Sequence, residues 1–468
     1  ISNAIIQSSE THNSATLLAT SREFNHSTVA FRNITAHFQQ KRNVGLIYPY
    51  FLLSAAGESN VSFSEIAINS NVTKSVDALF TFRGSYLACN IQLERLTWRG
   101  SSDVDSCVAV WLHKALMNSF NTFVIADIDI TCATQSLRSM GLKFEQSVVH
   151  AAIVAKHINF TAATLSPSSI STFLLNSDAV VTNIRLSNIE VRVVTPNTAA
   201  TFISVVHELG TVLPPTKFPV HNMVVEDSTV LLEGGDDTTM LYLQYIRDSA
   251  IVFRNINASI STPTKHTAAP DGSQVFVKNS RSTSVAISSS TLTASYKRVA
   301  ALLLHLANDS SSFSLTLRNT DLRLQSAEND VYMIRLQRTI TDVNVTIHDS
   351  TAQLLFGGRT AYLADVISSV DTQVAGGKAL LTFENTSTTV TATTANDTSI
   401  HLLDFGNATI PARSDVKLAV DLRFSQSSIT TNSLFPTEAR LGVLVGVEEN
   451  ATITPTTITL DRSRFDNF

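Results

Sequence analysis

The chain has 468 residues, a formal net charge of −5, 44% apolar residues and only 16% charged residues. The apolar share supplies a sizeable core and argues against a disordered chain, and the absence of any Lys/Arg run argues against a nucleic-acid partner. The most apolar stretch, Val44–Ala56, is too short for a membrane-spanning helix and contains a proline, so we expect no transmembrane segment in this chain.

The chain begins at Ile1 without the basic and apolar regions of a secretory signal peptide. We interpret it as a mature protein or as a piece of a longer one. Ser2–Glu10 and Thr452–Asp466 read as further strands and not as polar caps.

Short apolar strands recur along the chain about every 33 residues, which is typical of a repeat protein. We predict that a repeat unit begins at each of these segments: Ser14–Thr20, Val44–Leu53, Asp77–Phe82, Cys107–Leu112, Val148–Ala155, Ser171–Asn176, Ala200–Val206, Met240–Tyr245, Gln274–Asn279, Ala300–Ala307, Val331–Gln337, Ala361–Ile367, Ser399–Phe405 and Arg440–Gly446. Only one interval, the one before Ser171, is clearly shorter than the others.

Behind these starts come stretches in which apolar and polar residues alternate, as in a half-buried strand. The clearest are Asn90–Trp98, Phe123–Ile130, Ile184–Val193, Ile251–Ile260, Val285–Ala294 and Ala419–Ile429. Only Ser106–Asn118 leaves a helix open as an alternative. The complete unit is plainest in Ala300–Ser326 and again in Val331–Phe356: a short buried strand, a polar turn, an alternating strand, a corner and a third short strand.

Short strands, corners in place of Asn-Gly hairpin turns and a constant period predict an all-β fold, a parallel right-handed β-helix (β-solenoid) of about 14 coils. Residues 1–468 would form a single elongated solenoid that is part of a longer chain or the stacking unit of a filament. The alternative is a series of tandem β-sandwich domains.

Twelve asparagines stand in Asn-x-Ser/Thr sequons, which indicates a secreted glycoprotein. They are Asn25, Asn33, Asn60, Asn71, Asn159, Asn257, Asn308, Asn344, Asn385, Asn396, Asn407 and Asn450. In several of them the middle residue is large and apolar, as in Asn159-Phe160-Thr161. Because residues i and i+2 of a strand share a face, the asparagine and the hydroxyl would face solvent while the middle residue enters the core.

The three cysteines, Cys89, Cys107 and Cys132, lie close together in the sequence and form no CxxC element, so a zinc site is poorly supported. We interpret them as one disulfide and one remaining thiol, with three buried free thiols as the alternative. The sequence does not decide which pair is joined.

The unit pattern, an apolar strand followed by xVxLxNSxLxL, resembles that of the right-handed β-helix proteins of the pectin-lyase-like superfamily. The Ser/Thr/Asn-rich, sequon-rich and Cys-poor style is similar to that of the dispersed-gene-family surface proteins of kinetoplastid protists. The likeness covers the whole chain, but no single motif carries it. It implies a β-helix with either a cell-surface role or the polysaccharide-cleaving activity found in that superfamily.

Pectin hydrolases of this superfamily use Asn-Thr-Asp, Gly-Asp-Asp, Gly-His-Gly and Arg-Ile-Lys elements in that order. Gly235–Asp237 and Asn319–Asp321 match two of them, but in the reverse order and without the other two. Two carboxylates that cleave a glycosidic bond lie about 5–10 Å apart, so these elements would have to lie on neighbouring coils. We therefore interpret Glu233–Asp237 as a solvated corner loop.

Other candidate groups also have simple structural interpretations. His305 and His348 lie on predicted strands and are interpreted as strand residues, not as catalytic bases. Asp127 and Asp129 are interpreted as an outward-facing pair, with a cation site as the alternative. We expect no catalytic set, no cofactor and no metal.

Two functions from different classes follow. The first is a structural or adhesive extracellular glycoprotein, a component of a cell-surface coat, hair or filament whose partners are neighbouring solenoid segments stacked end to end. The alternative is a carbohydrate-active enzyme or sugar-binding module on a pectin-lyase-like scaffold, with an extracellular carbohydrate as the partner.

Overall fold

The structure of the chain, a computed structural model, divides into two compact units, Ile1–Gly235 (unit 1) and Asp236–Phe468 (unit 2). It describes residues 2–11, 17–19, 24–40, 48–72, 77–102, 106–134, 138–164, 171–195, 198–206, 220–235, 237–262, 271–307, 310–337, 340–367, 377–393, 399–403, 418–433, 440–441 and 457–466. All the strand pairs resolved within either unit are parallel, and no helix occurs among these residues.

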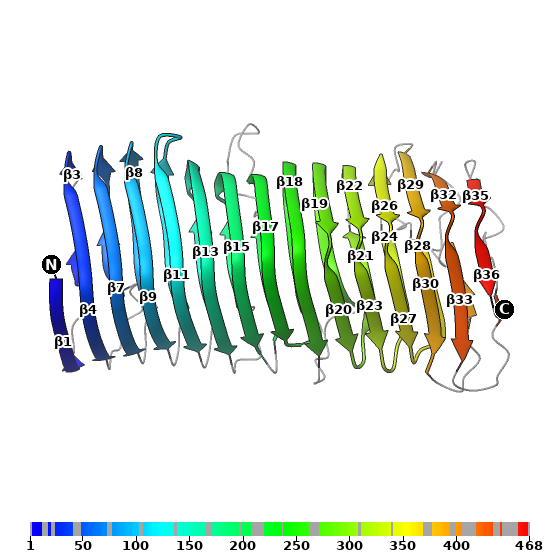
Figure 1. The fold of residues 1–468 in the computed structure, drawn as a ribbon, viewed down its shortest axis with the longest axis horizontal. Coiled ribbons are helices and arrows are strands. Elements are labelled where there is room, and N and C mark those ends of the chain that lie inside the picture. Colours follow the sequence, from blue (N-terminus) through cyan, green and yellow to red (C-terminus); the bar gives the residue numbers. More distant parts are fainter. Residues whose placement is uncertain are drawn as a thin grey trace, which may run out of the picture. The chain divides into compact units, whose positions relative to one another are not determined.

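Unit 1 is a parallel β-solenoid in which each long strand pairs with its counterpart one coil away, and these strands lie side by side in Figure 1. The long strands are β1 (Ser2–Thr11), β4 (Thr28–Gln40), β7 (Asn60–Val72), β9 (Asn90–Ser102), β11 (Thr122–Thr134), β13 (Val148–Thr164), β15 (Val180–Val194) and β17 (Val220–Glu233). The shorter strands are β2 (Leu18–Ala19), β3 (Phe24–Asn25), β5 (Tyr48–Leu53), β6 (Ala56–Gly57), β8 (Asp77–Leu87), β10 (Cys107–Met117), β12 (Ser139–Glu145), β14 (Ser171–Ser177) and β16 (Ala200–Val206).

Unit 2 is also a parallel β-solenoid, but after its first strands each coil has two strands where unit 1 has one long strand. β18 (Thr239–Thr262) and β19 (Asp271–Ser288) are long and pair with each other. The strands before the bend are β22 (Ser310–Arg318), β25 (Ile340–Thr341), β26 (Val343–His348), β29 (Gly377–Glu384), β32 (Leu418–Ser425) and β35 (Thr457–Asp461). Those after it are β20 (Thr291–Tyr296), β23 (Asp321–Ser326), β27 (Thr351–Phe356), β30 (Ser387–Ala392), β33 (Ser428–Ser433) and β36 (Arg464–Asp466), and the third ladder holds β21 (Ala300–Ala307), β24 (Val331–Gln337), β28 (Thr360–Ile367), β31 (Ser399–His401) and β34 (Arg440–Leu441).

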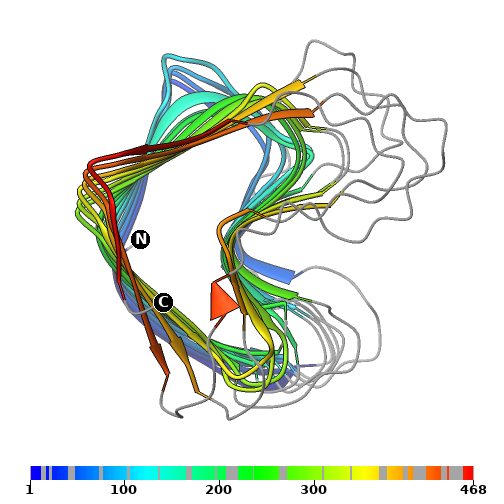
Figure 2. The same ribbon diagram turned by 90° about the vertical axis from the view of Figure 1, so that its right-hand side faces the viewer.

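Stacking places residues of the same position in successive coils directly over one another, and within each unit the strands of one ladder superpose in Figure 2. One inward column of unit 1 is Ile6, Ala36, Ile68, Trp98, Ile130, Phe160, Val191 and Val230. All of them except Ile6 are buried. Because a single coil cannot bury its own inward face, the core exists only through this stacking.

The long strands bend at residues with positive φ, which also stand over one another and form what we call the bend row. In unit 1 the bend row is Asn3, Asn33, Glu65, Arg95, Asp127, His157, Asn188 and Asp227. In unit 2 it is Asn255, Ser289, Asn319, Asp349, Asn385, Gln426 and Arg462. Side chains of the bend row lie at the outer corner of each coil, where no column of core residues covers them.

Shorter strands such as β14 and β16 are buried on both faces over most of their length, and β21 is buried along its whole length. This explains why the predicted unit starts are uninterrupted apolar runs and not alternating ones. The predictions of an all-β fold and a parallel solenoid are confirmed, and the alternative of tandem sandwiches is wrong for the described residues, whose resolved pairs are parallel and not antiparallel. Ser106–Asn118 contains the strand β10, not a helix.

One predicted unit start is wrong. Val148–Ala155 belongs to the long strand β13, and the shorter strand of that coil is β12, about ten residues earlier. The apolar pattern of the sequence does not reveal β12, because Gly141 and Lys143 interrupt the apolar run. Gly141 is required by packing: a β-carbon there would come within 2.9 Å of the Phe173 ring in the next coil.

Candidate functional site

The candidate site lies on the bend row of unit 2, where successive coils place Ser289, Asn319, Asp349 and Asn385 at φ angles of 49–50°. Asn and Asp tolerate this left-handed conformation better than other residues, because their short side chains can hydrogen-bond locally. The four side chains therefore project at the same corner, with about 4.8 Å between neighbouring coils.

The residues that follow the bend stabilise this corner through hydrogen bonds from buried hydroxyl groups to the backbone. Ser290, Thr320 and Ser350 are buried, and their hydroxyls donate to the carbonyl two residues earlier, as from Ser290 to Ser288 and from Ser350 to His348 at 2.7 Å. The Ser350 hydroxyl also accepts a hydrogen bond from the Thr320 amide at 3.1 Å. The polar backbone at the bend is thus satisfied within the protein.

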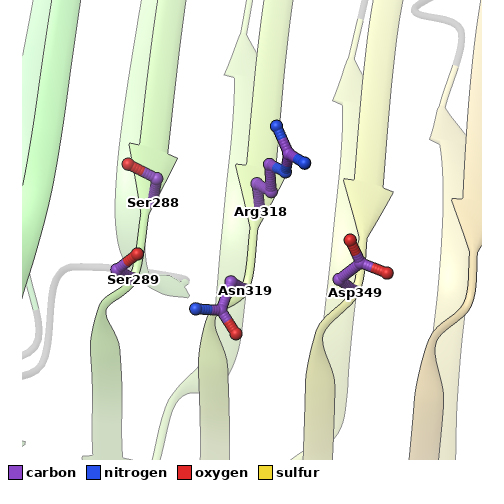
Figure 3. A pocket seen from close by; sticks show the side chains of 5 residues that line it. All are labelled: Ser288, Ser289, Arg318, Asn319 and Asp349. Atoms are coloured by element: carbon purple, nitrogen blue, oxygen red, sulfur yellow. The ribbon is translucent and has the colours of Figure 1, made fainter.

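An open depression of about 530 Å³ lies on this corner and is lined by Ser288, Ser289, Arg318, Asn319 and Asp349 (Figure 3). Ser288 and Arg318 stand in register on neighbouring strands, each just before a bend. The lining side chains therefore come from three successive coils and meet only because the coils are stacked.

Hydrogen-bond donors and acceptors face the depression together. The Asp349 carboxylate accepts a hydrogen bond from Asn385 Nδ2 at 2.6 Å, and its other oxygen lies 2.6 Å from His348 Nδ1. Arg318 is exposed, and Figure 3 shows its side chain extending along its strand, away from Asn319. One cation, one carboxylate, an amide and two hydroxyls suit a ligand that both donates and accepts hydrogen bonds, such as a sugar.

The structure describes eight of the twelve sequon asparagines, and all eight are exposed: Asn25, Asn33, Asn60, Asn71, Asn159, Asn257, Asn344 and Asn385. The other four, Asn308, Asn396, Asn407 and Asn450, lie outside the described residues. The middle residues Ile34, Val61, Phe160 and Val345 are buried, as expected, whereas the same expectation for Asn71-Val72-Thr73 falls on side chains that the structure does not describe. The expected arrangement of these strands is confirmed, and the attachment of glycans stays a prediction.

The two aspartate elements considered for catalysis are not brought together. Asp236 lies outside the described residues, and Asp237 is exposed just before the first residue of β18. Asp321 begins β23 and is in register with Thr291, which is in register with Asn257 near the far end of β18. Asp237 and Asp321 thus belong to different corners of unit 2.

The other candidates have partners within the fold. His305 is buried in β21, and its Nε2 lies 3.1 Å from Gln337 Oε1. Asp127 stands on the bend row with its carboxylate 3.0 Å from His157 Nδ1, and Asp129 is exposed two residues later. Within the described ranges no three His, Cys, Asp or Glu side chains come together in a way that could hold a metal ion.

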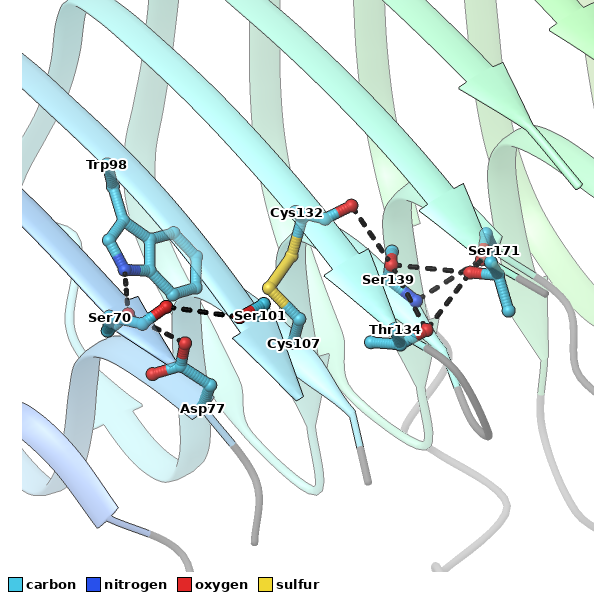
Figure 4. The surroundings of a disulfide bond; sticks show 10 residues. Ser70, Asp77, Trp98, Ser101, Cys107, Cys132, Thr134, Ser139 and Ser171 are labelled. Atoms are coloured by element: carbon cyan, nitrogen blue, oxygen red, sulfur yellow. Dashed lines mark hydrogen bonds between the residues drawn. A yellow bond between two sulfur atoms is a disulfide. The ribbon is translucent and has the colours of Figure 1, made fainter. Parts of the chain in front are cut away.

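Cys107 on β10 and Cys132 on β11 form a disulfide (Figure 4), and Cys89 is a buried free thiol. Cys89 stands at the position that Ser59 holds one coil earlier. Its Sγ lies 3.2 Å from the Ala56 carbonyl, and its amide donates to Asn121 Oδ1 at 2.7 Å. Its burial makes a structural role the simplest interpretation.

A completely buried carboxylate, Asp77, lies next to the disulfide (Figure 4). Ser70 donates to its Oδ2 at 2.7 Å, and Trp98 Nε1 in turn donates to the Ser70 hydroxyl at 3.1 Å. Burial raises the pKa of Asp77 to about 7, even though the Ser70 and Tyr50 hydroxyls act in the opposite direction.

Sequence reasoning missed two clusters on the outward faces of the shorter strands. In unit 1, Glu145 lies 3.0 Å from Trp111 Nε1, 2.8 Å from His113 Nδ1 and 3.2 Å from Lys143 Nζ. Burial raises the pKa of Glu145, but Lys143 and His113 outweigh it and leave the pKa below its ordinary value. Burial also lowers the pKa of His113.

In unit 2 the corresponding cluster joins a buried ion pair to stacked rings. Arg335 Nε lies 2.9 Å from Asp365 Oδ2, and the guanidinium stands 3.7 Å above the Tyr332 ring. The Tyr332 and Tyr362 rings are stacked with 4.5 Å between their centroids. Because these rings cover one another and are mostly buried, both clusters are interpreted as packing between coils. The only signal in the sequence was a charged or aromatic residue inside an apolar run.

The described residues include no helix long and apolar enough to cross a lipid bilayer. Comparison of the sequence with protein-family models and with curated proteins finds no match.

Proposed function

We propose that this chain is a structural or adhesive glycoprotein of the cell exterior, a component of a coat, hair or filament. The observation that carries the proposal is the exposure of all eight described sequon asparagines, six of which are followed by a buried residue. A fold that keeps twelve such sites in its sequence and turns the described ones outward is well suited to carry glycans.

The finer description of the fold belongs to the same proposal. A right-handed helix of about 14 coils, a single solenoid over residues 1–468 and membership of the pectin-lyase-like superfamily stay predictions, as does the likeness to surface proteins of kinetoplastid protists. The right hand is supported by the general rule that parallel crossovers are right-handed.

End-to-end stacking is supported by the residues at the two ends of the inward columns. Ile6 is only partly buried although its neighbours in the column are buried. Leu460 is 52% exposed, whereas Phe383 and Phe424 in the same column are buried and stacked at 4.8 Å. A further coil over each end would bury these side chains and pair the free strand edges.

Glycopeptide mass spectrometry of the protein secreted from eukaryotic cells tests the glycoprotein assignment. We expect glycans on several of the eight exposed sequons, and peptides with every sequon unmodified would contradict the proposal.

Stacking is tested separately with charged substitutions at the ends. Ile6→Lys and Leu460→Lys should shorten or abolish end-to-end rods in negative-stain images, because a lysine at an inward position cannot be covered by another coil. The matched control is Ile5→Lys: Ile5 is 79% exposed on the opposite face of the same strand, so rods should keep their length. Rods of equal length in all three variants would rule out this mode of assembly.

A further inference from the structure

Asn385 stands at the edge of the corner depression. It is the next member of the bend row after Asp349, to which its Nδ2 donates at 2.6 Å. It is also the first residue of the sequon Asn385-Thr386-Ser387, in which Thr386 is buried and Asn385 and Ser387 are exposed. A glycan on Nδ2 would replace one of its two hydrogens and leave the other for Asp349.

The spacing of the coils matches the size of a sugar. Asp349, Asn319 and Ser289 lie one, two and three coils from Asn385, which corresponds to about 5, 10 and 14 Å at the usual strand separation. A pyranose unit is about as long as one coil is high. Sugars that follow the row from Asn385 would therefore meet one polar bend residue after another.

The chemistry of the depression also fits a tethered sugar better than a free one. Arg318 and Asn319 can donate to sugar hydroxyl or acetamido oxygens, and Asp349 and the serine hydroxyls can accept. None of the described residues that line the depression is aromatic, so little apolar area would be gained from them and a free sugar would bind weakly. A short covalent tether supplies an effective concentration in the millimolar range, which is enough to fill a weak site.

We propose that the N-glycan of Asn385 folds back onto this corner and that its first sugars occupy the depression lined by Ser288, Ser289, Arg318, Asn319 and Asp349. The inference rests on the glycosylation proposed above. The docked sugars would cover the bend backbone and shield the Asn385 linkage.

The test compares glycan release from two sites of the same folded glycoprotein. The rate at which a peptide N-glycosidase removes the glycan of Asn385 is measured by glycopeptide mass spectrometry, with Asn344, an exposed residue of β26, as the internal control. In the variant Arg318→Ala with Asn319→Gly, we expect release at Asn385 to become several-fold faster and release at Asn344 to stay unchanged. Glycine keeps the positive φ at residue 319, so the bend is retained.

Hydrogen exchange of β22 and β26 distinguishes undocking from unfolding. Faster release at Asn385 with unchanged exchange in these strands supports docking, and equal acceleration at Asn385 and Asn344 contradicts it. Unchanged release at an occupied Asn385 overturns the docking alone. An unoccupied Asn385 overturns it together with glycosylation at that sequon, so the two failures are distinguishable.

Discussion

Most coils of the two units build the same bend with different chemistry at the residue that follows it; Ser228 of unit 1 and Ile256 of unit 2 are exceptions. In unit 1 this residue is a branched apolar one in six successive coils: Ile34, Ile66, Leu96, Ile128, Ile158 and Ile189. In unit 2 it is a buried hydroxyl residue in five: Ser290, Thr320, Ser350, Thr386 and Ser427. The same backbone turn can thus be stabilised by apolar burial or by hydrogen bonds to the backbone.

The choice of chemistry coincides with a change in the strand itself. Where isoleucine or leucine follows the bend, one strand runs through it, as in β9. Where serine or threonine follows in unit 2, one strand ends and another begins, as in β22 and β23. In unit 1 the strand β17 is an exception, since it runs through Ser228 after the bend residue Asp227. A hydroxyl that bonds to the carbonyl two residues earlier favours a local turn over the regular ladder.

Buried carboxylates show a second contrast. Asp77 of unit 1 relies on hydroxyl partners and has a raised pKa, whereas Asp365 of unit 2 is 3% exposed and paired with Arg335 at 2.9 Å. A neighbouring cation favours the charged form of a buried carboxylate strongly, whereas hydroxyl donors favour it less, and at Asp77 they do not offset the effect of burial.

The largest expected effect comes from replacing Asp77, the buried carboxylate of unit 1 that has hydroxyl partners. The carboxyl of Asp77 titrates at 3.8 when unfolded and at about 7 when folded, so between these pH values the folded state keeps a proton that the unfolded state has lost. Stability therefore falls as pH rises over this range. In Asp77→Asn this loss should disappear, which corresponds to about 4 kcal/mol above pH 7 at about 1.4 kcal/mol per pK unit.

Urea unfolding of the full chain at pH 5 and pH 8 covers about two of these pK units, so the parent protein should lose about 3 kcal/mol between the two pH values. Asp129→Asn, at an exposed position, serves as the control and should leave the pH dependence unchanged. If Asp77→Asn and the parent protein lose the same stability between the two pH values, the account of Asp77 is wrong.

Giving unit 1 the chemistry of unit 2 should have an effect of similar size. Ile158 is fully buried, so Ile158→Ser removes apolar contacts and should destabilise the coil by about 3–5 kcal/mol. Hydrogen exchange of β13 reads this locally, which matters because long repeat arrays need not unfold in one step. Ile158→Val keeps the shape and should cost about 1 kcal/mol. Similar exchange in both variants would show that the position after the bend in unit 1 does not depend on apolar burial.

In unit 2 the corresponding loss is one of hydrogen bonds. Ser350→Ala leaves the Thr320 amide without its 3.1 Å partner and should cost about 1–3 kcal/mol, seen as faster exchange at that amide. Ser350→Thr keeps the hydroxyl, as Thr386 does one coil away, and should restore protection. Full protection in the alanine variant would show that the hydroxyl row does not hold the bend.

The smallest expected effect tests the cost of a positive φ by itself, at a corner outside the bend row. Ala88 is exposed at a corner of unit 1 with φ of 52°, which an L-residue adopts at a cost of about 1–2 kcal/mol. Ala88→Gly should therefore stabilise the protein by up to about 1 kcal/mol in urea unfolding. Ala67→Gly, at an exposed strand position, should destabilise it by about 0.5–1 kcal/mol, and equal signs for the two variants would contradict the strain at residue 88.

Much of the fold could be predicted from the sequence because each part of a coil has its own pattern. Ala300–Ser326 contains β21, β22 and β23 in the predicted order, since a doubly buried strand is an apolar run and a half-buried strand alternates. The strand β12, which contains Gly141 and Lys143, was not predicted because its position is fixed by contact with the next coil and not by its own composition.

The candidate site could be predicted only in part. Asn319 stood out in the sequence, but for a catalytic motif and not for its position on a bend. Ser288 and Asp349 lie about 30 residues away on either side, and only the register of three stacked coils brings them to the same depression. Bend residues such as Glu65 and Arg95 carried no turn signal, because their conformation is imposed by the neighbouring coils.

The regular bend row also shows where this chain can accept additional sequence. Successive bend residues from Asn3 to Asn188 are 30–32 residues apart, but Asn188 and Asp227 are 39 apart, and β15 still pairs with β17. The extra length is accommodated outside the long strands, where it cannot reverse their inward and outward faces. Peptides inserted between β11 and β12, and between β13 and β14, would therefore be displayed one coil apart, as an ordered array of epitopes.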